Sequence, residues 1–186
     1  MKKLGLATIA VSAVVLANAA NALEYTPYVG LDYTYSNINT EGNSGFSPQY
    51  SGANINVGAN YNQFFGTELF YQMTGTQNNR DFVGTSTLKS NYKAWGLDLM
   101  GYLPLGCDGD VALVGTAGLG EYYFYEKLEG VGRGSHDNAT GYRLGGGAIY
   151  NIDSNWSVRS LVRYVAIERA DVDHLWDFSA GVRYNF

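Results

Sequence analysis

Residues 175–186 read Leu-Trp-Asp-Phe-Ser-Ala-Gly-Val-Arg-Tyr-Asn-Phe, and apolar residues alternate with small or polar ones along the whole stretch. A period of two indicates a β-strand, because successive side chains of a strand point to opposite faces. A strand with one apolar face, one polar face and aromatic residues at its end is typical of a transmembrane β-barrel. The apolar face carries Trp176, Phe178, Ala180, Val182, Tyr184 and Phe186.

The beginning of the sequence has the pattern of a secretion signal. Lys2 and Lys3 precede the apolar residues 4–17, and Ala20-Asn21-Ala22 is a small-x-small cleavage site. We therefore expect a signal peptide at residues 1–22 and a β-barrel at residues 23–186, with Ala17-Asn18-Ala19 as the alternative cleavage site. The apolar run is shorter than the roughly 20 residues that a membrane helix needs.

The composition favours strands and argues against several other classes of protein. Hydrophobic residues make up 46% of the chain, which holds 16 Tyr, 8 Phe and 24 Gly, and no later apolar run is long enough for a membrane helix. The net charge of −5 becomes more negative when Lys2 and Lys3 are removed with the signal, so nucleic acid is not an expected partner. The single cysteine, Cys107, excludes an intramolecular disulfide.

Eight alternating segments follow the signal, separated in turn by long polar stretches and short turns. The predicted strands are residues 25–35, 50–61, 64–74, 92–103, 111–125, 140–150, 156–166 and 175–186. The predicted long loops are residues 36–49, 75–91, 126–139 and 167–174. This pattern predicts an all-β, eight-stranded, antiparallel up-and-down transmembrane barrel in which the last strand pairs with the first. Both termini and the three short turns are expected on the periplasmic side.

A soluble β-sandwich is the alternative, because its strands also alternate. The polar face argues against it: Asn54, Asn56 and Asn60 recur at every second position, where a solvent-exposed face usually carries many Lys and Glu. Closure is required in lipid, since an open sheet edge would leave backbone groups without partners. Strict alternation places one acid, Glu121, on the lipid face, so we expect it at the outer rim or next to a bulge.

The chain resembles the small eight-stranded outer-membrane barrels, which include the OmpA membrane domain, OmpX, Ail and the opacity-type surface proteins. The resemblance rests on Tyr28-Val29-Gly30-Leu31-Asp32-Tyr33 and on the terminal set Phe178, Ala180, Val182, Tyr184 and Phe186. It implies that the terminal set is the signal recognised by the barrel-assembly machinery. It also implies export through the periplasm to the bacterial outer membrane, with membrane lipid and lipopolysaccharide as surroundings.

The polar faces of the predicted strands carry equal numbers of acids and arginines. They are Asp32, Glu68, Asp98 and Asp177, and Arg143, Arg159, Arg163 and Arg183. An eight-stranded barrel is just wide enough for its side chains to fill, so we expect an interior ion-pair network that stabilises the barrel. The other interpretation is a gate, because related barrels are thought to conduct weakly when such pairs rearrange.

No pattern predicts an enzyme, a metal site or a cofactor. Ser135, His136 and Asp137 are consecutive and cannot adopt the geometry of a catalytic triad, and His174 lies in another loop. Two classes of function remain. The first is a surface protein whose loops contact host or neighbouring molecules, since recognition usually resides in loops on a rigid scaffold. The second is a narrow pore for small solutes or ions.

The predicted network leads to a first test. Removing one partner of a buried ion pair costs roughly 3–5 kcal/mol, because the other charge is left without compensation. We therefore expect Arg143→Ala to lower the free energy of unfolding of the refolded barrel by about this amount, as measured by urea titration. An unchanged unfolding midpoint would mean that Arg143 is solvated or lies on the other face.

Overall fold

The computed structural model describes residues 25–39, 49–80, 87–106, 110–128, 134–169 and 172–186. The expected signal peptide at residues 1–22 and Cys107 lie outside these ranges. In the part of the chain that is described, no helix is both long and apolar enough to cross a membrane.

The chain runs back and forth as long strands. They are β1 (Thr26–Asn39), β2 (Gln49–Asn62), β3 (Phe65–Thr74), β4 (Gln77–Arg80), β5 (Thr87–Leu105), β6 (Val111–Leu128), β7 (Gly134–Asn151), β8 (Trp156–Arg169) and β9 (Val172–Asn185). We call the barrel end at which β1 ends and β2 begins the loop end. The opposite end, at which β2 ends and β3 begins, is the turn end.

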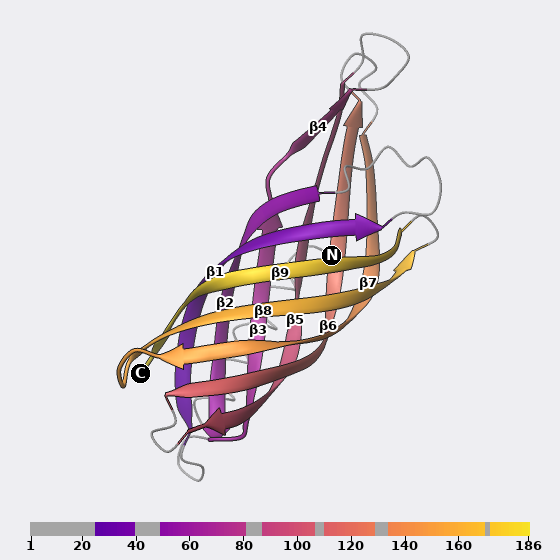
Figure 1. Ribbon diagram of the computed structural model, residues 1–186. Helices are drawn as coiled ribbons and strands as arrows, with labels where there is room; N and C mark the ends of the chain where they lie inside the picture. Colours follow the sequence, from indigo (N-terminus) through magenta and orange to yellow (C-terminus); the bar gives the residue numbers. More distant parts are fainter. Residues whose placement is uncertain (1–24, 40–48, 81–86, 107–109, 129–133, 170–171) are drawn as a thin grey trace, which may run out of the picture.

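The sheet closes on itself. Each strand pairs antiparallel with its neighbour in the order β3-β2-β1-β9-β8-β7-β6-β5, and pairing of β3 with β5 completes the circle. The last strand pairs with the first as expected, with Tyr33 opposite Ala180. The short β4 also pairs with β5, next to the pairing of β3 with β5. Figure 1 shows the strands tilted and arranged around a common barrel axis. The predicted fold class, an eight-stranded antiparallel barrel, is confirmed.

Several strands are longer than the sequence pattern predicts. β5, β6 and β7 extend into the predicted loops 75–91 and 126–139, and β4 lies within the first of them. β1, β2, β8 and β9 likewise extend into the predicted loops 36–49 and 167–174. The predicted boundaries are wrong because apolar alternation marks only the part of a strand that faces lipid. Backbone pairing continues beyond it, for example between Ser90 and Glu126, and needs no apolar side chain.

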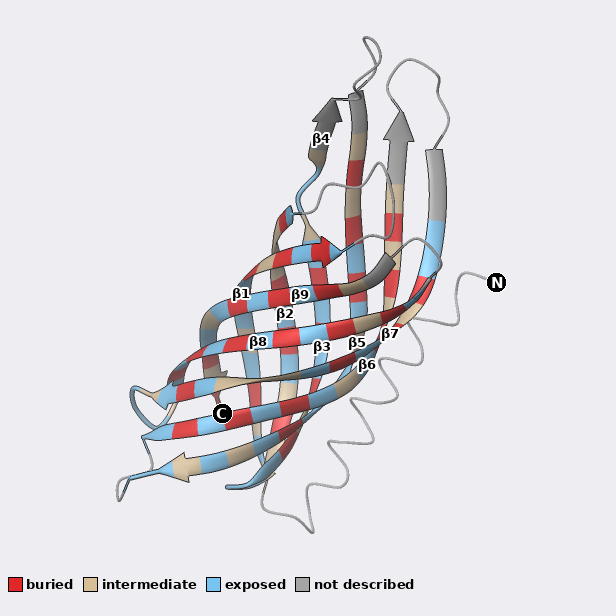
Figure 2. Cartoon of the chain, turned by 45° about the vertical axis from the view of Figure 1, so that its right-hand side comes forward, coloured by how far each residue is buried: buried red, intermediate tan, exposed pale blue. Residues whose placement is uncertain are grey.

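The two faces of each strand have opposite surroundings, as predicted. Figure 2 shows exposed and buried residues alternating along the strands. The outer face carries large exposed apolar side chains from neighbouring strands, including Leu31, Val57, Leu69, Leu97, Leu99, Leu113, Leu144 and Val182. The lumen face buries polar residues, among them Asn54 and Asn56. Exposed apolar residues of this size around a whole barrel match a wall that contacts lipid.

Glu121 lies on the outer face without a bulge. β6 pairs with both neighbours in unbroken register, and Glu121 is opposite Trp95 on β5 and Thr140 on β7. Trp95 is in turn opposite Tyr71, so the acid is level with aromatic side chains rather than with the leucines nearer the middle of β5. The Thr140 hydroxyl donates a hydrogen bond to Glu121 at 3.1 Å. The contact with Thr140 and the neighbouring aromatic side chains are consistent with a position of Glu121 at the membrane interface.

The position of the wall in the bilayer can be tested with two arginine substitutions on β5. Leu99 and Leu105 are both exposed on the outer face, the first inside the strand and the second at its last residue on the turn end. An arginine near the bilayer midplane costs about 2–4 kcal/mol, and one near the interface about 0–1. We expect Leu99→Arg to destabilise the barrel in vesicles by the larger amount and Leu105→Arg by the smaller. Equal unfolding free energies for the two variants would contradict this orientation.

Candidate functional site

The lumen contains a connected set of buried charges, and we call it the lumen network. It consists of Asp32 on β1, Glu68 on β3, Asp98 on β5, Arg143 on β7, Arg159 and Arg163 on β8, and Asp177 on β9. Each of these side chains is at least nine-tenths buried. The network thus connects strands on opposite sides of the barrel, and β2 supports it through two asparagines.

Arg159 makes the strongest contacts of the lumen network. It donates two hydrogen bonds to Asp32, at 2.9 and 2.7 Å, and also binds Glu68 through both terminal nitrogens. Asp32 accepts further hydrogen bonds from Asn54 at 3.1 Å and Asn56 at 3.0 Å. Paired, charge-assisted hydrogen bonds of this kind are about twice as strong as neutral ones. They tie β8 to β1, β2 and β3.

Arg163 lies between the remaining acids. Its guanidinium is 3.6 Å from Asp98 and 3.9 Å from both Glu68 and Asp177, and it donates a hydrogen bond to Ser179 at 3.1 Å. Glu68 and Asp98 are direct cross-strand partners, an arrangement that is repulsive for like charges. The arginine between them compensates this repulsion. Its position follows from the alternation of β8, which directs Arg159 and Arg163 into the lumen.

Arg143 completes the lumen network on the β7 side. It lies 3.5 Å from Asp98, and its guanidinium stacks over the ring of Phe70 at 3.6 Å from the centroid. Neither Arg143 nor the carboxylate of Asp98 has a side-chain hydrogen bond within the described residues. This pair is therefore held by charge and stacking alone, in contrast to the paired hydrogen bonds of Arg159.

Two glycines let these ion pairs cross an intervening strand. Gly118 on β6 is opposite both Asp98 and Arg143, and Gly181 on β9 is opposite both Asp32 and Arg159. A Cβ atom on Gly118 would overlap Asp98 and a backbone carbonyl, and one on Gly181 would overlap Asp32. The absence of a side chain at these positions allows two charges, two strands apart, to approach each other.

The prediction that Arg183 belongs to the ion-pair network is wrong. It points into the lumen, but it forms no ion pair with any carboxylate among the described residues. Its guanidinium instead stacks over Tyr28 at 4.3 Å and donates a hydrogen bond to the Tyr102 hydroxyl at 3.2 Å. Arg183 lies nearer the turn end, and the hydrogen-bonding capacity of Asp32 is already used by Arg159 and the asparagines.

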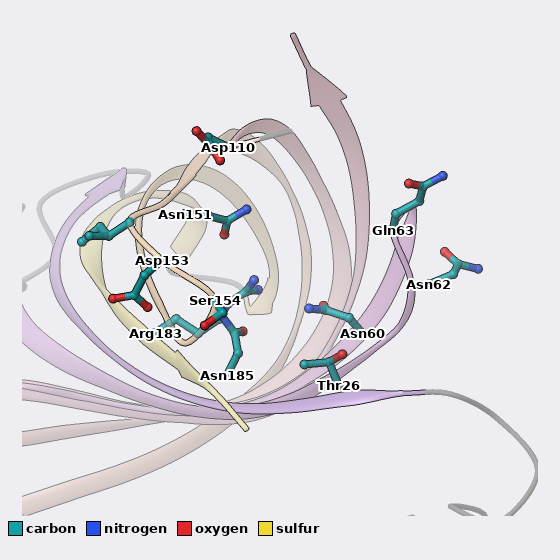
Figure 3. A pocket seen from close by; sticks show the side chains of 11 residues that line it. Thr26, Asn60, Asn62, Gln63, Asp110, Asn151, Asp153, Ser154, Arg183 and Asn185 are labelled. Atoms are coloured by element: carbon teal, nitrogen blue, oxygen red, sulfur yellow. The ribbon is translucent and has the colours of Figure 1, made fainter. Parts of the chain in front are cut away.

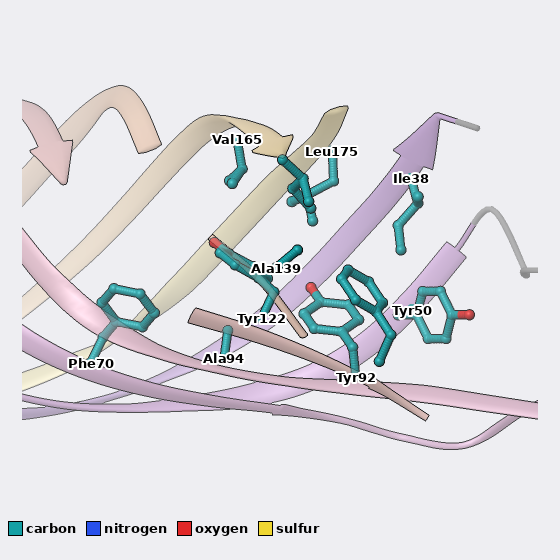
Figure 4. Packing of buried hydrophobic residues seen from close by; sticks show 11 residues of the cluster. Ile38, Tyr50, Phe70, Tyr92, Ala94, Tyr122, Ala139, Val165 and Leu175 are labelled. Carbon is teal, nitrogen blue, oxygen red and sulfur yellow. The ribbon is translucent and has the colours of Figure 1, made fainter. Parts of the chain in front are cut away.

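The sequence pattern places some apolar residues on inward faces but does not predict that they gather into clusters. Toward the loop end, Figure 4 shows buried aromatic and aliphatic side chains directed at one another: Ile38, Tyr50, Phe70, Tyr92, Ala94, Tyr122, Ala139, Val165 and Leu175, with Phe124 and Ile167 in the same cluster. Toward the turn end a second cluster holds Met100, Ala112, Val114, Ile149 and Leu161. Alternation of Tyr122 with Tyr123 already indicates an inward aromatic, but the charged and amide residues on the inward faces predict a polar lumen.

Hydrogen bonds join the aromatic cluster to the lumen network. Gln72 donates to the Tyr92 hydroxyl at 3.0 Å and to Asp177 at 3.2 Å, and the Ser36 hydroxyl donates to Asp177 at 2.9 Å. Tyr92 in turn donates to Ser36. The lumen network and the aromatic cluster thus form one continuous packing of charges, polar groups and rings. The described residues contain no cluster of side chains suited to a metal ion.

The residues of the expected assembly signal lie on the outer face of β9 and at Phe186, directly after it. Phe178, Ala180, Val182 and Phe186 are exposed there, and Tyr184 is half-buried. Tyr184 packs edge-on against Trp156 and against Phe186, with ring centroids 5.1 Å apart in both pairs.

The glycine positions give a second test of the lumen network. Gly118→Ala places a methyl group against Asp98, and such overpacking typically costs about 1–3 kcal/mol. Gly115 lies on the outer face of the same strand and has no atom within 4 Å of its Cβ position, so Gly115→Ala is a matched control. We expect urea unfolding to show destabilisation by Gly118→Ala only. Equal stability of the two variants would contradict the close approach at Gly118.

Comparison with known proteins agrees with this architecture. Residues 6–186 match the family described as outer membrane protein beta-barrel domain. Comparison with curated proteins finds no match. The barrel is similar to that of Ail, the attachment invasion locus protein of Yersinia pestis, in a crystal structure with the heparin analogue sucrose octasulfate. The identity is 17% and the TM-score 0.64, with 88% of this chain and 100% of that chain covered.

Two further solved structures share the fold. Neisserial surface protein A is 16% identical with a TM-score of 0.59, and 87% of this chain and 97% of that chain are covered. A major outer membrane protein from Thermus thermophilus is 11% identical with a TM-score of 0.65, covering 87% and 99%. At these identities the likeness establishes the fold, whereas the family match spans nearly the whole chain. The chain therefore belongs to the family of small outer-membrane β-barrel proteins and is an integral protein of the bacterial outer membrane.

Proposed function

We propose that this protein is a surface protein that contacts other molecules through its loop end, and that its lumen is a structural core rather than a conduit. The observation that carries the proposal is the filled lumen. The lumen network and the two apolar clusters place side chains in the barrel interior that are almost completely buried. Wide channels require about sixteen strands, so recognition at the surface remains the main role open to this barrel.

The loop end supports this proposal by its shape. β5, β6 and β7 are 19, 18 and 18 residues long, whereas β1, β2, β8 and β9 have 14 each. Figure 1 shows that β4 to β7 rise beyond the rest of the barrel on one side. We call this extension the ridge. A hydrogen-bonded ridge holds the described ends of its strands in fixed positions, which reduces the entropy lost when a partner binds them.

The ligand class is constrained by charge. Ail has been crystallised with a polysulfated heparin analogue. This chain has a formal net charge of −5, and its expected third and fourth loops include Glu126, Glu129, Asp137, Glu168, Asp171 and Asp173 against Lys127, Arg133 and Arg169. A surface of this sign repels polyanions over several ångströms at physiological salt. Neutral or cationic surface partners, from a host or a neighbouring cell, therefore suit it better than heparin-like chains.

The remaining partners follow from the outer-membrane location. Lipid and lipopolysaccharide surround the apolar wall, and the barrel-assembly machinery recognises the outer face of β9 through Phe178, Ala180, Val182, Tyr184 and Phe186. The exposure of most of these side chains supports this role. No enzymatic role is proposed for the barrel.

A narrow, low-conductance pore is the second candidate. The observation that favours it is the ion pair of Arg143 and Asp98, which is held only weakly in place. The two side chains lie 3.5 Å apart and have no side-chain hydrogen bonds to described residues. A pair held in this way can separate more readily than Arg159 and Asp32. Separation alone does not open the lumen, however, because the aromatic cluster still occupies the level toward the loop end.

Conductance across planar bilayers distinguishes the two candidates. We expect refolded protein, checked for its heat-shifted gel mobility, to give no reproducible current steps, because the lumen is filled at several levels. The variant Arg143→Gln should be equally silent. Current steps in the parent protein that change in size on Arg143→Gln or Glu68→Gln would contradict the proposal and assign the lumen network to a pore.

The ridge can be tested in cells that display the protein. Replacing residues 126–135 by an Asn-Gly turn shortens the β6–β7 hairpin but leaves the pairing of Tyr125 with His136. We expect adhesion of these cells to epithelial monolayers to fall to the level of cells without the protein. A full-length variant with Glu126, Lys127, Glu129 and Arg133 changed to Ser separates the effect of charge from that of length. Undiminished adhesion by the shortened hairpin, with normal surface amounts, would overturn the proposal.

A further inference from the structure

The turn end contains a cationic group that the lumen network does not use. Arg183 is 5% exposed, and its Nε atom has no hydrogen-bond partner among the described residues. Its two ring contacts, with Tyr28 and Tyr102, hold the guanidinium in place but do not neutralise its charge. A buried guanidinium without a carboxylate is costly, and an anion that reaches it would gain both charge and hydrogen-bond stabilisation.

A cavity of about 670 Å³ opens at this position. Figure 3 shows its lining side chains arranged around the barrel mouth, with Arg183 among them. Most of the lining is polar and uncharged: Thr26, Asn60, Asn62, Gln63, Asn151, Ser154 and Asn185. The side-chain oxygens of Asn60 and Asn185 are also buried without a hydrogen-bond partner in the described residues. The volume lies within the range of pockets that hold small molecules.

The charges around the cavity limit the kind of anion. Asp110 and Asp153 also line it. Asp153 already accepts hydrogen bonds from the backbone of Asn155 and Trp156, at 2.8 and 2.7 Å, whereas Asp110 is exposed. With one arginine against two acids, a singly charged group is favoured over a dianion such as phosphate. The uncharged polar side chains of the lining add hydrogen-bonding groups beside the charge.

We propose that this cavity binds a carboxylate that carries neighbouring N–H groups and enters from the turn end, with Arg183 as its anchor. Arg183 supplies the cation, and the uncharged polar side chains of the lining hydrogen-bond the attached N–H groups. The carboxylate comes from a small acylated amino acid or from the end of a peptide chain. The site is independent of the ridge and of any surface partner.

Titration of refolded protein in micelles tests the site, with the Nε–H resonances of the arginines and the backbone amide resonances of the lining residues followed by NMR, so that variants of Arg183 can be measured as well. The probes are N-acetylglycine, its amide N-acetylglycinamide, triglycine with a free or an amidated C-terminus, and inorganic phosphate. We expect a saturable shift of the Arg183 signal with N-acetylglycine at millimolar concentration, and none with either amide. Tighter binding of free triglycine than of N-acetylglycine would identify chain ends as the source, and equal binding would identify small carboxylates.

Variants decide whether the shift comes from this cavity. Arg183→Gln should abolish binding, and Arg183→Lys should weaken it. Asp110 is exposed, so Asp110→Asn leaves the fold undisturbed, and removing its charge should strengthen binding about two- to fivefold. Lys93→Gln at the loop end is the matched control and should leave the affinity unchanged. The proposal is overturned by equal shifts with the amides, by the absence of saturation at about 20 mM probe, or by unchanged affinity in Asp110→Asn.

Discussion

The paired hydrogen bonds from Arg159 to Asp32, continued by its contact with Glu68, are the interaction on which the interior depends. A closed wall of strands in lipid directs every second side chain into a lumen where water is scarce. Charges placed there must neutralise one another across the barrel, since an uncompensated one would cost several kcal/mol. The positions of Arg163, Arg143 and the two crossing glycines can all be understood as ways of meeting this requirement.

The sequence predicts the wall far better than the interior. Alternation assigns the face of each residue without knowledge of its neighbours, because the period of a strand is fixed by the backbone. For this reason the outward leucines and the inward acids and arginines are predicted correctly as to side. Alternation contains no information on depth, however, so it cannot show that Arg183 lies a level below the acids. It also cannot show that β5, β6 and β7 continue past the lipid.

The apolar clusters illustrate a different limit. Tyr92, Tyr122 and Phe124 occupy inward positions by simple alternation, but an aromatic residue fits either the lipid face or a filled lumen. Only the diameter set by the strand number, together with the strand tilt, decides that rings fill the space at this level. Function is even harder to predict from the sequence, because the same barrel fold supports unrelated functions through different loops. The filled lumen and the one-sided ridge are what direct attention to the loop end.

The order in which the barrel assembles follows from the span of its central contacts. Arg159 and Asp32 are separated by 127 residues along the chain, and Arg159 and Glu68 by 91. Contacts between such distant residues form only after long loop closure, so they contribute nothing to a growing, open sheet. Until β9 joins β1, Arg159 cannot reach Asp32, whereas pairs on neighbouring strands, such as Arg163 and Asp177, can already form. The contacts of Arg159 therefore stabilise the barrel only once its sheet has closed, which makes them a late contribution to folding.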